Sequence, residues 1–116
     1  MRRILAFAAA AALVTGSAAS AADAQAGYDD AIKRLNACLS AGSAGAPRDS
    51  LAAAATALRS LCYTQIRRAH ERRELLVERT GQAANPGVLE DLKLAARRDL
   101  DRQILLAIST FTGLQS

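Results

Sequence analysis

The chain has 116 residues and a net charge of +4, and aromatic residues make up only 3% of it, with no Trp. This length leaves room for one small domain, and the charge is too weak to demand a nucleic-acid partner, so we expect none. Apolar burial must come from Leu, Ile and Ala, and each Ala contact buries little area. A small core with so few large apolar side chains is expected to need a disulfide or self-association for stability.

The N-terminal 26 residues are predicted to be a secretory signal peptide that is cleaved. Arg2 and Arg3 precede an apolar run at residues 4–14, which is too short to cross a bilayer of about 30 Å as a helix. Two Ala-x-Ala cleavage sites follow, at residues 22–24 and 24–26. No Cys follows the apolar run, which argues against a lipoprotein. The alternative is a retained N-terminal anchor.

Export sets the expected compartment. Ala and Arg are abundant while Lys is rare, as in bacterial genomes of high GC content, so we expect the periplasm, or secretion beyond it. Once processed, the protein would not span a membrane. Residues 27–116 are predicted to form an all-α domain, a small three-helix domain made of one short helix and a long antiparallel helical hairpin.

The first helix is predicted over residues 28–41. Four apolar side chains recur at helical spacing, and two Asp residues lie in the first turn, where they suit the helix dipole. Gly42 ends this helix, and residues 42–49 form a loop by composition. The apolar residues are Tyr28, Ile32, Leu35 and Leu39.

The second helix is predicted to run unbroken over residues 50–80. Ala, Leu, Arg and Glu dominate, and no Gly or Pro interrupts it. Asp49 or Ser50 can cap its start and Gly81 its end. Its length of about 46 Å is large for a small domain and favours an exposed end or a partner helix. The first half carries a core stripe, whereas the second half resembles a solvated arm with an apolar end.

The third helix is predicted over residues 86–112. Asn85 as N-cap and Pro86 in the first turn mark its start, and Gly113 marks its end. Spacing assigns Leu92, among others, to its buried stripe, and the short link before it makes it antiparallel to the second helix. Residues 104–108, ILLAI, are apolar nearly all round and need cover on several sides, part of which a second protomer could supply.

The only two cysteines, Cys38 and Cys62, are predicted to form a disulfide, because an even count in an exported protein favours one. Two buried thiols and an intermolecular bridge are the alternatives. A bond within the chain requires a staggered pair, with the first helix beside residues 59–72 and the loop over the Ala-rich start of the second helix.

An arginine-rich face is a candidate site for anions, such as a component of the cell envelope. Acidic residues are interleaved with it, and a solvated face of ion pairs is the alternative. His70 and Glu74 share a face and are expected to pair, but two ligands do not make a metal site, and we expect no metal and no cofactor. The candidate arginines are Arg67, Arg68, Arg72, Arg73, Arg97 and Arg98.

The apolar end of the hairpin is the predicted partner contact, unless its residues only cover one another. No nucleophile, base and acid occur at catalytic spacing, so we expect no enzyme. The expected function is protein–protein interaction or scaffolding, with another protein or a second copy as partner. The alternatives are a periplasmic chaperone or stress protein and an envelope-binding module. The contact residues are Leu75, Leu76, Val77, Val88 and Leu89.

Overall fold

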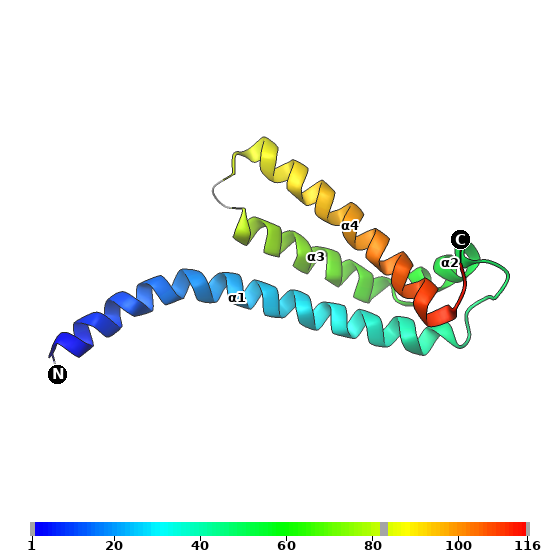
Figure 1. The fold of residues 1–116 in the computed structure, drawn as a ribbon, viewed down its shortest axis with the longest axis horizontal. Helices are drawn as coiled ribbons and strands as arrows, with labels where there is room; N and C mark the ends of the chain where they lie inside the picture. Colours follow the sequence, from blue (N-terminus) through cyan, green and yellow to red (C-terminus); the bar gives the residue numbers. More distant parts are fainter. Residues whose placement is uncertain (1, 82–83, 116) are drawn as a thin grey trace.

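The computed structural model describes the backbone of residues 2–81 and 84–115, and the side chains from Ser20 onward. The predicted all-α class is confirmed. These residues form four helices rather than three, and Figure 1 shows the last three folded against the C-terminal part of the first. They are α1 (Arg2–Ser43), α2 (Leu51–Leu61), α3 (Tyr63–Thr80) and α4 (Pro86–Thr112).

Helix α1 begins far upstream of the predicted residue 28, because the Ala-rich segment before Tyr28 continues the same helix. Its N-terminal part extends past the α3–α4 turn (Figure 1). Contact with the core begins at Ala24, which is 6% exposed. The predicted inward face is confirmed, since Tyr28, Leu35 and Leu39 are buried. Cleavage at either predicted site would therefore remove one small core residue.

The predicted unbroken helix over residues 50–80 is wrong at Cys62, where the chain changes direction between α2 and α3. Cys62 has φ −102° and ψ 23°, yet its N–H donates to the Leu58 carbonyl and its carbonyl accepts from the Ile66 N–H. Because neither Gly nor Pro lies here, we attribute the bend to packing. Cys62 is fully buried and covalently joined to α1.

The disulfide between Cys38 and Cys62 lies within the chain, as predicted, with the two Cα atoms 6.0 Å apart. Further along the same pair of helices, the Arg73 guanidinium lies over the Tyr28 ring at 5.2 Å. Helices α1 and α3 are thus antiparallel neighbours (Figure 1), in the staggered arrangement that the disulfide requires.

The bend lets α2 cross the end of the bundle between α1 and α4. Ser50 caps it by accepting a 3.0 Å hydrogen bond from the Ala53 N–H, and Ala54, Ala55 and Leu58 are buried. The preceding loop is tied to α4, since Arg48 donates to the Thr112 carbonyl at 2.7 Å. The core at this end therefore involves three helices and the loop.

Helix α4 has the predicted bounds. Asn85 accepts from the Val88 N–H at 2.9 Å, and Gly113 ends the helix in the left-handed conformation, with φ 74°. Ile104 and Ile108 are buried, whereas Leu106 between them is 60% exposed, so the bundle covers only part of the ILLAI segment. Over residues 20–81 and 84–115, no helix has a stretch long and apolar enough to cross a membrane.

Candidate functional site

The predicted partner contact at the end of the hairpin is largely covered by its own residues. Leu76 is buried at 7% exposure, and Leu75, Val77 and Leu89 are partly buried. Of the five candidates only Val88 is exposed, at 46%. This end of the hairpin alone therefore offers little apolar surface.

Val88 belongs instead to a line of exposed residues along α4, which we call the outer stripe: Val88, Leu92, Ala95 and Leu106. Leu92 is 44% exposed and Leu106 is 60% exposed, so the assignment of Leu92 to the buried stripe is wrong. Spacings of four, three and eleven residues keep these positions on one side of the helix over about 27 Å. The stripe follows the a and d positions of a heptad pattern.

Two charged residues interrupt the middle of the outer stripe. Asp99 and Arg102 occupy the next a and d positions and form an ion pair of 2.7 Å with each other. The stripe is thus apolar from Val88 to Ala95, charged at Asp99 and Arg102, and apolar again at Leu106. The sequence of α4 contains two apolar stripes at helical spacing. The stripe through Ala96 and Leu100 is the buried one, and the outer stripe is exposed.

Two further large apolar residues are exposed at the bend. Leu61 and Tyr63 are 64% and 63% exposed, and they flank Cys62, which is fully buried. The disulfide holds this part of the backbone in place, so both side chains project from a fixed position. Sequence reasoning missed them because it placed one straight helix here.

The candidate arginines of α3 do not share one environment. Arg73 lies over Tyr28 towards the core, Arg72 approaches Gly27 of α1, and Arg67 forms an ion pair of 3.7 Å with Glu71. The Nε atom of Arg73 is buried without a hydrogen-bond partner among the described residues. Arg97 and Arg98 are exposed on α4.

Arg68 lines a groove of about 400 Å³ between α1 and α3, together with Arg34 of α1. Arg34 is also paired with Asp30 at 2.9 Å. Two guanidinium groups beside the polar side chains of Thr64 and Gln65 can bind an anion. The sequence did not point to Arg34, because this cluster arises only when two separate helices pack together.

The predicted pairing of His70 with Glu74 is wrong. The Nε2 atom of His70 lies 2.8 Å from Asp101 of α4, and Glu74 instead faces Lys93 at 3.7 Å. Lys93 also contacts Glu78 at 2.7 Å, a hydrogen bond that raises the lysine pKa. These contacts join α3 to α4. Among the described residues, no three His, Cys, Asp or Glu side chains are placed to hold a metal ion.

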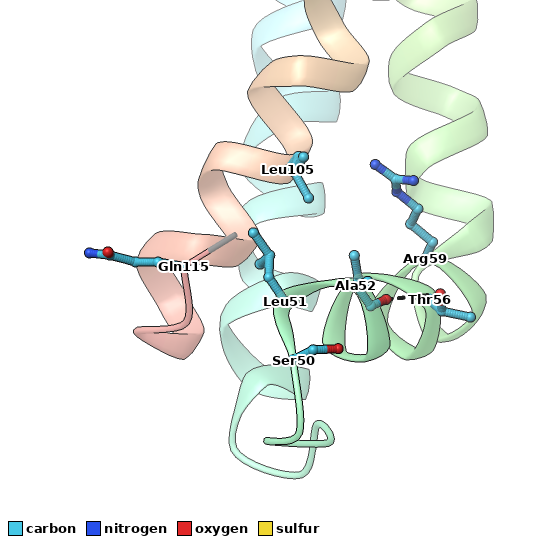
Figure 2. A pocket seen from close by; sticks show the side chains of 8 residues that line it. Ser50, Leu51, Ala52, Thr56, Arg59, Leu105 and Gln115 are labelled. Atoms are coloured by element: carbon cyan, nitrogen blue, oxygen red, sulfur yellow. Dashed lines mark hydrogen bonds between the residues drawn. The ribbon is translucent and has the colours of Figure 1, made fainter.

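A second groove, of about 470 Å³, lies between the start of α2 and the end of α4 (Figure 2). Leu51, Ala52 and Ala55 of α2 and Leu105 of α4 supply its apolar walls. Arg59 is the only charged residue of α2, and its side chain extends from α2 in the direction of Leu105 (Figure 2). Sequence reasoning did not identify this groove, which depends on the bend at Cys62.

No protein-family model, no curated protein and no solved structure gives a significant match to this chain.

Proposed function

We propose that this is an exported, periplasmic helical protein without catalytic activity that acts by binding another protein, for which a second copy is the simplest candidate. The observation that carries the proposal is the outer stripe of α4, where three aliphatic side chains are 44–60% exposed at heptad spacing. A line of this kind is the usual contact between two helices.

The outer stripe is suited to an antiparallel partner helix. In that orientation an a position of one helix faces a d position of the other, so Val88 would face Leu106 of a second copy at each end. In this register Asp99 would face Ala95 and Arg102 would face Leu92 of the second copy, while their ion pair with each other is kept. The expected contact is narrow, so the association would be weak and reversible.

Sedimentation velocity of the disulfide-closed protein over a range of concentrations tests self-association. The double variant Val88→Glu/Leu106→Glu places like charges opposite each other at both ends of the contact; it is expected to remain folded and to shift the monomer–dimer equilibrium to monomer. Leu94→Glu is the matched control, because Leu94 is also exposed on α4 but lies about 200° around the helix from Leu92. If both variants associate equally, the outer stripe is not the contact between the two copies.

A photo-crosslinking residue at position 106 tests for a different protein as partner. In the cells that make the protein, position 106 is expected to give a discrete crosslinked product, and position 94 much less of it. Monomeric behaviour together with no product from position 106 would reject the proposal. A smear of many products, with suppressed aggregation of an unfolded client, would instead indicate the chaperone alternative.

The groove between α1 and α3 favours a second candidate function, binding of an anionic envelope component. Arg34 and Arg68 line it together. Binding to anionic vesicles that persists at about 0.15 M salt, and that Arg34→Gln/Arg68→Gln removes, would support this function. Binding lost entirely at that salt concentration would indicate only screened, non-specific attraction.

A further inference from the structure

The groove between α2 and α4 has the features of a site for a small amphiphile. We propose that it binds a single-chain anionic lipid of the free fatty acid class, with the acyl chain along Leu51, Ala52, Ala55 and Leu105 and the carboxylate at Arg59 (Figure 2). The site is separate from the outer stripe and does not depend on protein binding.

The size and lining of the groove fit an acyl chain. Its volume of about 470 Å³ lies in the range of small-molecule sites, about 300–1,000 Å³. The small side chains of Ala52 and Ala55 leave space, while Leu51 of α2 and Leu105 of α4 provide the larger apolar contacts. Each CH₂ group of an alkyl chain that leaves water for this groove would strengthen binding.

Among the residues that line the groove, Arg59 is the only charged one, which favours a ligand with a negatively charged acceptor. The Ser50 hydroxyl oxygen is occupied by the Ala53 N–H, and the Thr56 hydroxyl donates to the Ala52 carbonyl at 2.9 Å. Arg59 forms no ion pair with any described residue, so its guanidinium is available for a carboxylate. An apolar trough with one available cation matches an alkyl chain with one negative head group.

Isothermal titration of the disulfide-closed protein with dodecanoate, below its micelle concentration, tests this site, with dodecanol as the uncharged probe. We expect saturable binding of dodecanoate and binding of dodecanol at least about tenfold weaker. Arg59→Gln is expected to reduce dodecanoate binding by a similar factor. Arg79→Gln, the loss of an exposed arginine on α3, is the control and should change nothing.

Ala52→Trp tests the position of the alkyl chain. Ala52 is exposed and lines the groove, so a large side chain there fills the space without entering the core, and circular dichroism verifies the fold. We expect dodecanoate binding to be lost. The proposal is overturned if dodecanoate does not bind saturably, if dodecanol binds as tightly, or if either Arg59→Gln or Ala52→Trp leaves the affinity unchanged.

Discussion

At the scale of single residues, Gly42 at the end of α1 shows how closely α1 and α2 approach each other. A Cβ atom added there would lie 2.8 Å from Cδ2 of Leu58 and 2.6 Å from Cδ2 of Leu61. Leu61 is exposed and can move away, but Leu58 is 1% exposed and has no free space. We therefore interpret this glycine as required by close packing of α1 against α2.

Gly42→Ala is expected to lower the free energy of unfolding by about 1 kcal/mol. Overpacking strain of about 1–3 kcal/mol outweighs the gain in helix propensity, which is at most about 1 kcal/mol. Urea unfolding followed by circular dichroism measures the difference. Gly45→Ala is the matched control, since no atom lies within 4 Å of a Cβ at that position. Equal urea midpoints for Gly42→Ala and Gly45→Ala would contradict a close approach of α1 to α2 at Gly42.

Two ionisable side chains, Tyr28 and Lys93, make the free energy of unfolding depend on pH in the alkaline range. Burial raises the pKa of the Tyr28 phenol, although the nearby Arg73 acts in the opposite direction. The hydrogen bond to Glu78, with the neighbouring carboxylates, raises the pKa of Lys93 despite partial desolvation. In both cases the folded state holds its proton more tightly than the unfolded state. Their stabilising contribution is complete below about pH 10 and is lost as the pH rises above it.

The urea midpoint is therefore expected to be lower at about pH 11 than at about pH 9. Tyr28→Phe and Lys93→Met should each reduce this pH dependence, since each removes one of the groups that lose a proton. Tyr63→Phe is the control, because Tyr63 is 63% exposed. A midpoint that rises with pH over this interval would contradict the sign of both shifts.

At the scale of elements, the disulfide joins α1 to the bend between α2 and α3. It connects cysteines separated by 24 positions. For a loop of this size, chain entropy in the unfolded state gives a stabilisation of about 3–4 kcal/mol. In a core with so few aromatic residues, that is a large share of a total stability of about 5–15 kcal/mol.

Reduction of the disulfide is expected to lower the free energy of unfolding by about 3–4 kcal/mol. Urea unfolding with and without a phosphine reductant measures this loss. The double variant Cys38→Ala/Cys62→Ala should unfold near the midpoint of the reduced protein and should not respond to the reductant. An unchanged midpoint on reduction of the native protein would show that the bundle is stable without the covalent link.

Local sequence signals predicted α4 well and the bend poorly. Asn85, Pro86 and Gly113 act on their immediate neighbours, so the bounds of α4 follow from the sequence. Cys62 carries no helix-breaking signal. Its conformation follows from burial and from the bond to Cys38, which are tertiary effects that local propensity does not contain.

The candidate surfaces were harder to predict than the fold. Spacing alone shows that α4 has two apolar stripes, but only packing decides that Leu100 faces the core and Leu92 faces outward. The grooves beside Arg34 and Arg59 each require two helices to meet. Such sites depend on the relative placement of elements, which a single sequence specifies only indirectly.

At the scale of the whole molecule, the described chain extends over 69 × 34 × 20 Å, and much of the long dimension is the N-terminal part of α1 beyond the hairpin (Figure 1). The predicted cleavage sites at residues 22–24 and 24–26 lie where α1 first meets the core. Removal of the preceding segment would leave a more compact bundle that retains Tyr28, the disulfide and the outer stripe.

Under the proposed function, the form of the protein that binds a partner is the exported one, with its signal peptide removed and its disulfide closed. The intact mass of the protein recovered from the cells that make it, with and without reductant, tests both at once. We expect a chain that begins at Gln25 or Gly27 and that gains two hydrogens on reduction. A mass that still includes residues 1–24, or that does not change on reduction, would contradict an exported bundle closed by Cys38 and Cys62.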